Sequence, residues 1–166
     1  MKAWAKSVLA RLRDEEGASV IELAVSCTVI FTMLIGICQL SLGLYAYQFC
    51  SDAARQATRY AMVRGSTSHI NTPNLSNSPA SSTDISNYVK GLGYTGIKSS
   101  GITVTTTWCA ASSGTPTTWS SCSSGTSNAP GNLVKVVVAY PLSMHIPFAP
   151  QLSLSLSSTS QMVIAQ

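Results

Sequence analysis

The longest apolar stretch of the chain runs from Leu23 to Ser51, 29 residues without a charged side chain. About 20 apolar residues, each rising about 1.5 Å along a helix, cross the hydrocarbon core of a bilayer. The stretch therefore predicts a transmembrane helix over about residues 23–47. A buried core helix is the alternative, but it needs a large domain around it. The rest of the chain is too rich in Ser and Thr to supply one.

The charges that flank this stretch predict its orientation. Four basic residues precede it and three follow it: Lys2, Lys6, Arg11 and Arg13, then Arg55, Arg59 and Arg64. Because cytoplasmic flanks carry the excess of Lys and Arg, we expect a cytoplasmic N-terminus. A cleavable secretory signal is disfavoured, since its apolar region has only about 7–15 residues. The acidic residues 14–16 also lie where such a signal keeps positive charge.

Helical spacing continues beyond the predicted span. Small residues fall on one helix face there: Cys50, Ala53, Ala54, Ala57 and Ala61. Arg64 in the last turn, followed by Gly65, is a C-terminal helix signal. We therefore expect one helix over about residues 19–64, roughly 70 Å long. Its first half fits the bilayer, and a sheet is expected to cover the alanine face of its second half.

Alternating apolar and polar positions after this helix predict three strands. They are expected over residues 101–108, 133–140 and 152–164. A turn at Pro141 is expected to follow the second strand. Three strands suggest a small antiparallel sheet. The predicted fold class is therefore α+β, a long N-terminal transmembrane helix with a small antiparallel β domain over 65–166.

Between the long helix and the first strand, the pattern predicts a loop and a short helix. Residues 66–82 are expected to form the loop. The short helix is expected over 85–92, capped by Thr83 or Asp84. Residues 66–130 contain 28 Ser and Thr among 65, so hydroxyls and not charges make this region polar. That composition suits an extracytoplasmic surface.

The small number of charges excludes several functions. Charged residues make up 10 % of the chain, and no Asp or Glu follows Asp84. The second half therefore has no carboxylate pair for acid–base chemistry. Gly91 to Gly96 matches G-x-G-x-x-G, but a dinucleotide site needs a strand before it, a helix after it and an acid further on. His69 and His145 are isolated, which disfavours a zinc site or a triad. We expect no catalytic residue, metal or cofactor.

The net charge of +4 does not predict nucleic-acid binding, because no run of basic residues occurs beyond the first 13 positions.

Glu22 is the unusual residue of the apolar helix, because it lies inside its start. A charged side chain at the bilayer centre costs about 2.5–3.5 kcal/mol, and less near the edge. One interpretation is that Glu22 only marks the interface. The other is that a cation partners it in an assembly.

The surroundings of Glu22 resemble the class III signal of type IV pilins: a basic stretch, Gly17, then Glu five residues further on, then a long apolar helix. The resemblance implies that a prepilin peptidase cuts between Gly17 and Ala18. Residues 1–17 would then be the leader, and Ala18 would become an N-methylated N-terminus. It also implies that Glu22 pairs with the N-terminal amine of a neighbouring subunit. The acidic residues 14–16 depart from the basic leaders of many pilins.

Two further segments resemble TadE-like proteins, the minor pseudopilins of the Tad/Flp (type IVc) pilus system. They are residues 51–61, which continue the helix, and residues 134–141, a strand followed by proline. The resemblance implies a pilin-like fold and a non-enzymatic role in pilus biogenesis, secretion and adherence. It implies a prepilin peptidase, other pilins and an inner-membrane assembly platform as partners. It places the chain in the bacterial inner membrane, with residues 65–166 outside the cytoplasm.

Two alternatives stay open. One is an uncleaved, single-pass anchor whose outer domain binds an envelope partner, for which retention of residues 1–17 is the mark. The other is a minor pseudopilin of a type II secretion system.

The helix carries a stripe of small residues at a spacing of four: Ala24, Thr28, Thr32 and Gly36. Small residues let helix backbones approach closely in lipid, so the stripe is a candidate subunit-assembly surface. The alternative is that such residues are common in any membrane helix.

Two cysteines of the outer domain, Cys109 and Cys122, bracket a loop. In an oxidising compartment they are predicted to form a disulfide that contributes about 3 kcal/mol. Cys50 is then the odd cysteine, and a free thiol is favoured over an intermolecular bridge.

Overall fold

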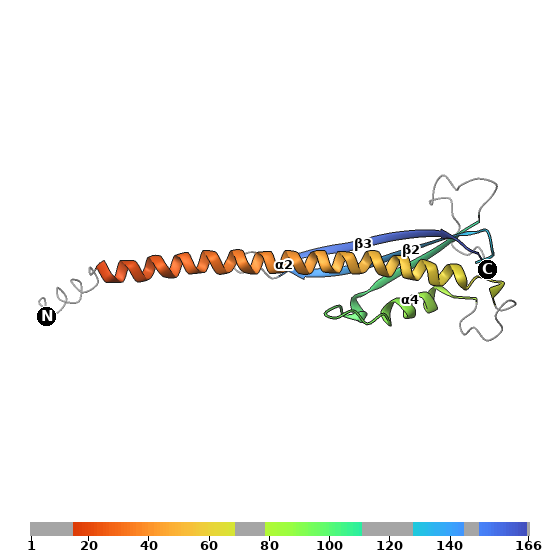
Figure 1. Cartoon of the computed structure of the whole chain (residues 1–166), viewed down its shortest axis with the longest axis horizontal. Helices are drawn as coiled ribbons and strands as arrows, with labels where there is room; N and C mark the ends of the chain where they lie inside the picture. Colours follow the sequence, from red (N-terminus) through yellow and green to blue (C-terminus); the bar gives the residue numbers. More distant parts are fainter. Residues whose placement is uncertain (1–14, 69–78, 111–127, 145–149, 166) are drawn as a thin grey trace, which may run out of the picture. The chain divides into compact units, whose positions relative to one another are not determined.

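The computed structural model describes residues 15–68, 79–110, 128–144 and 150–165. Its elements are helix α2 (Glu15–Val63), helix α4 (Ser82–Lys90), the 3-10 turn η1 (Ser99–Gly101) and three strands (Figure 1). The strands are β1 (Thr103–Cys109), β2 (Leu133–Met144) and β3 (Leu152–Val163). The chain divides into two units, residues 1–41 with 145–151, and residues 42–144 with 152–166. We call these the first unit and the outer unit. The predicted α+β class is confirmed.

The long helix is confirmed, with small differences at both ends. α2 begins at Glu15, four residues earlier than predicted, and ends at Val63. Arg64 therefore lies just beyond the last turn, and its prediction as a last-turn residue is wrong. Its guanidinium instead lies over the ring of Tyr60, with Cζ 3.9 Å from the ring centroid. The end of α2 is held by backbone hydrogen bonds from Ala80 N to Arg64 O and from Ala165 N to Met62 O.

The short helix is also confirmed, but it begins earlier and has a different cap. α4 covers Ser82–Lys90, and Ser81 is its N-cap. The Asp84 amide donates to the Ser81 hydroxyl at 3.2 Å, while the Ser81 amide donates to the Asp84 carboxylate at 3.0 Å. This reciprocal pair is a capping box. Neither Thr83 nor Asp84 is the N-cap, because Asp84 occupies the third helical position of the box.

We expect Ser81→Ala to destabilise α4 by about 1 kcal/mol, because one amide of the first turn loses its acceptor. Thr83→Ala is the matched control, since Thr83 is exposed and lies outside the box. Hydrogen exchange of the α4 amides measures the difference. Equal protection in the two variants would contradict the capping role of Ser81.

The same box predicts a pH dependence. Hydrogen bonds from the Ser81 hydroxyl and amide hold the pKa of Asp84 below its usual 3.8. A carboxyl whose folded pKa is lowered stabilises the fold above its unfolded pKa. Its contribution is then lost as the pH falls through the folded value. Protection of α4 is therefore expected to be constant near neutral pH and to fall below 3.8, whereas Asp84→Asn should flatten this step.

The three strands form the predicted antiparallel sheet in the order β1-β2-β3. β1 and β2 pair from Thr103 opposite Ala139 to Cys109 opposite Leu133. β2 continues through Pro141 to Met144, still paired with β3, so the predicted turn at Pro141 is wrong. Pairing with β1 stops at Ala139, and beyond it β2 has a strand on one side only. Proline is tolerated at such an edge because its missing N–H is not needed there.

The core of the outer unit lies between α2 and the sheet. The predicted alanine face is confirmed, since Cys50, Ala53, Ala54, Ala57 and Ala61 are at most 2 % exposed. They cluster with Val134, Val136 and Val138 of β2 and with Ile85 and Val89 of α4. The small face of α2, the valines of β2 and the two apolar residues of α4 therefore form one buried core.

Candidate membrane and assembly segment

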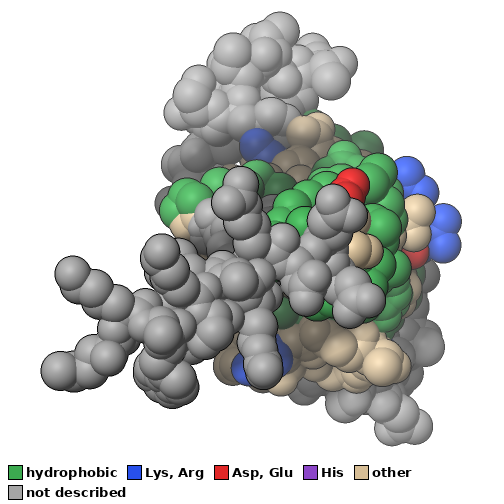
Figure 2. All heavy atoms as spheres, turned by 90° about the vertical axis from the view of Figure 1, so that its left-hand side faces the viewer, with side chains coloured by type: hydrophobic (Ala, Val, Ile, Leu, Met, Phe, Trp, Pro, Cys, Tyr) green, Lys and Arg blue, Asp and Glu red, His purple; other side chains and the backbone are tan. Residues whose placement is uncertain are grey.

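The N-terminal part of α2 is apolar and exposed. Its side chains include Ile21, Ile30 and Met33, which are 67 %, 62 % and 69 % exposed. The candidate span lies within Gly17–Val63, its most apolar window has a mean hydropathy of 2.3, and none of that window is buried. Figure 2 shows hydrophobic side chains gathered around this helix. The alternative of a buried core helix is therefore wrong. One such helix suggests a membrane anchor, because water is a poor solvent for a surface of this kind.

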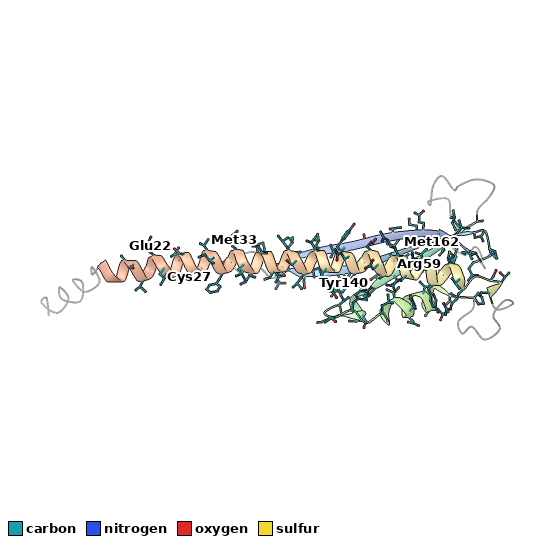
Figure 3. The ribbon with its side chains drawn as sticks, in the orientation of Figure 1. Glu22, Cys27, Met33, Arg59, Tyr140 and Met162 are labelled. Atoms are coloured by element: carbon teal, nitrogen blue, oxygen red, sulfur yellow. The ribbon has the colours of Figure 1, made fainter. Side chains whose placement is uncertain are left out.

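Gly17, Ala18 and Glu22 lie near the N-terminal end of α2, and all three are exposed. Figure 3 shows Glu22 on this part of the helix. A β-carbon built on Gly17 would meet no atom within 4 Å. Glu22 lies five residues further on, about 7.5 Å along the axis, and has no ion-pair partner among the residues that the structure describes. The carboxylate is therefore uncompensated within the described part of the chain. The predicted roles of these three residues in cleavage and assembly stay predictions.

The stripe of small residues forms internal hydrogen bonds. The Thr28 hydroxyl donates to the Ala24 carbonyl, and the Thr32 hydroxyl donates to the Thr28 carbonyl, both at 2.8 Å. A β-carbon on Gly36 would meet nothing within 4 Å. Both hydroxyls already donate to backbone carbonyls of their own helix. The stripe is therefore suited to close packing against another helix and not to hydrogen bonding with it.

Gly43, one heptad beyond Gly36, has a different environment. A β-carbon there would lie 3.4 Å from Met144 Cε and 3.6 Å from Leu142 Cδ2. The far end of β2 therefore covers Gly43, which packs within the outer unit.

The cysteines differ in their surroundings. Cys27, Cys38 and Cys50 are free among the residues that the structure describes, and Cys50 is fully buried. Its burial favours the predicted free thiol over an intermolecular bridge, and this stays a prediction. Cys109 is buried at the end of β1. Cys122 lies outside the described residues, so the Cys109–Cys122 disulfide stays a prediction.

The outer unit also contains a cleft that the sequence did not predict. The cleft has a volume of about 700 Å³ and lies between α4 and the C-terminal end of α2. It is lined by Tyr88 of α4 and by residues at or just after the end of α2, namely Gln56, Arg59, Tyr60, Val63 and Arg64. We call it the Arg–Tyr cleft. In the sequence, the only signal for this cleft is that its α2 residues are spaced by three and four positions and so share one helix face. Tyr88 reaches the cleft from α4, and no local pattern connects the two segments.

The fold and the exposed apolar segment define a class: an α+β protein with one N-terminal helix suited to membrane anchoring and a small outer unit. Residues 17–59 match the model of the family described as TadE-like protein. The resemblance expected from the sequence is confirmed over this segment, which supports a protein associated with the Tad pilus system. No curated protein and no solved structure matches the chain.

Proposed function

We propose that this chain is a minor pseudopilin that supports the assembly of a Tad/Flp pilus, and through it secretion and adherence. A prepilin peptidase removes residues 1–17 on the cytoplasmic face. The mature helix then remains in the inner membrane until the assembly platform adds the subunit to other pilins. Residues 65–166 lie outside the cytoplasm throughout.

The match of residues 17–59 to the TadE-like family carries this proposal. The matched segment begins at Gly17, the residue before the proposed cut, and includes Glu22 and the exposed apolar side chains of α2 from Val20 to Tyr47. The structure adds a physical reason for assembly. Glu22 has no ion-pair partner among the described residues. It gains a cation when a neighbouring subunit supplies its N-terminal amine, and a charge at bilayer depth is costly alone.

Deletion of the gene tests the function. We expect deleted cells to lose the filaments that shear releases from the wild type, and to regain them when the chain is supplied from a plasmid. Expression of the major pilin and of the assembly platform, measured in the same cells, is the control. Normal filaments with a specific loss of secreted enzymes would favour a type II secretion pseudopilin. Normal filaments and normal secretion would favour the anchored binding module.

A further inference from the structure

The Arg–Tyr cleft holds one guanidinium in a fixed orientation. The rings of Tyr60 and Tyr88 are stacked with centroids 4.4 Å apart and planes at 21°. Arg64 Cζ lies 3.9 Å from the centroid of the same Tyr60 ring. Two groups cannot share one ring face at these distances, so Arg64 and Tyr88 cover opposite faces of Tyr60. The stacked guanidinium keeps the N–H groups along its edge for an acceptor in the plane.

Arg64 has no such acceptor among the residues that the structure describes. Its Nε is buried and has no hydrogen-bond partner within them. Buried donors are nearly always paired in folded proteins, so an unpaired one indicates a missing acceptor. Arg59 lines the same cleft, and neither arginine forms an ion pair within the part of the chain that the structure describes. The cleft therefore brings together two positive charges that have no counter-charge in the described structure.

The chain has few carboxylates to offer. After Glu22 it contains six Lys and Arg but only Asp52 and Asp84 as acids. Asp84 already accepts hydrogen bonds from Ser81. A second copy of the outer unit would have the same shortage. The missing acceptor is thus expected to come from a different molecule that carries several negative charges.

We propose that the Arg–Tyr cleft binds an acidic peptide segment of another protein, with Arg59 and Arg64 donating hydrogen bonds to its carboxylates. Arg and Tyr are the residue types enriched at the energetic centres of protein interfaces, and arginine binds carboxylates through paired hydrogen bonds. An acidic polysaccharide is disfavoured, because both faces of Tyr60 are covered and no sugar ring can stack on them. The inference rests on the cleft alone and does not depend on the pilus proposal.

Binding of a hexaglutamate peptide to the full-length protein in detergent micelles tests the proposal by calorimetry. We expect saturable binding of hexaglutamate and none of hexaglutamine. Arg59→Gln and Arg64→Gln should each weaken binding about tenfold, because each removes a charge-assisted hydrogen-bonding group. Arg64→Lys should also weaken it, since lysine keeps the charge but loses the planar fork. Near-ultraviolet circular dichroism establishes that each variant keeps the tyrosine packing.

Arg55→Gln is the matched control. Arg55 is exposed on the same helix but does not line the cleft, so its removal lowers the net charge equally and should change binding less than about twofold. An equal loss in all three Gln variants would overturn the proposal, because the attraction would then be one of net charge. Tighter binding of trigalacturonate than of hexaglutamate would overturn it in favour of a polysaccharide. An absence of hexaglutamate binding would also overturn it.

Discussion

Ile85→Ala is expected to destabilise the outer unit by about 3 kcal/mol, through loss of apolar burial and a residual cavity. Ile85 is fully buried and lies in the cluster that joins α4 to the alanine face of α2 and to β2. Those neighbours are small or β-branched and fixed on rigid elements, so they cannot move far to fill the space. Thermal unfolding of the full-length protein in detergent, followed by near-ultraviolet circular dichroism, measures the effect.

Asn87→Ala is the control for this prediction. Asn87 is exposed on the same helix, so its substitution should change stability by no more than about 0.5 kcal/mol. A result in which both variants unfold at the wild-type temperature would show that α4 does not contribute to the core.

Glu22→Gln is expected to reduce assembled filaments at least about tenfold, because the amide keeps the shape of the side chain but removes the charge that would attract an amine. The substitution should leave folding unchanged, since Glu22 is exposed and makes no ion pair within the described chain. Insertion should become easier, because a neutral side chain costs less in the bilayer. Counts of sheared filaments, normalised to the amount of membrane-bound subunit, measure the effect.

Glu22→Asp is the companion variant, since it retains a carboxylate on a shorter side chain and should restore part of the assembly. Filament counts for Glu22→Gln equal to those of the wild type would assign Glu22 the simpler role of an interface marker.

The regular elements could be predicted because their patterns are local. The 29 uncharged residues, the spacing of the alanines and the alternation in β1, β2 and β3 each require only neighbouring positions. The end of β2 could not be predicted in this way. The residues around Pro141 favour a turn, yet Pro141 lies within β2. It is tolerated there because pairing of β1 with β2 stops at Ala139. The residues near Pro141 do not show where β1 ends, so the local sequence could not predict this outcome.

The N-cap and the cleft show the same limit. Ser81, Ser82 and Thr83 are adjacent hydroxyl residues that could each cap a helix, and the reciprocal bonds with Asp84 decide for Ser81. From the sequence, Arg59 is interpreted as a flanking charge and Arg64 as a flanking charge and a helix C-terminal signal. Neither pattern predicts a cleft, because the tyrosine neighbour on α4 is distant in sequence. Gly43 follows Gly36 of the stripe by one heptad, and only the fold shows that β2 covers it. For the candidate assembly residues, the sequence predicts only their positions on a helix. Their proposed partners belong to other molecules, so neither the sequence nor the fold of one chain identifies them.

The most direct test of a prepilin-type function is the intact mass of the protein from its native membrane. We predict an N-terminus at Ala18, with or without a methyl group, and an unprocessed chain for Gly17→Leu. Gly36→Leu is the matched control and should be processed. At both positions a β-carbon meets no atom within 4 Å, so a difference between the variants reports recognition by the peptidase. Residues 1–17 retained on the wild-type protein, in cells whose peptidase cleaves its other substrates, would contradict the account.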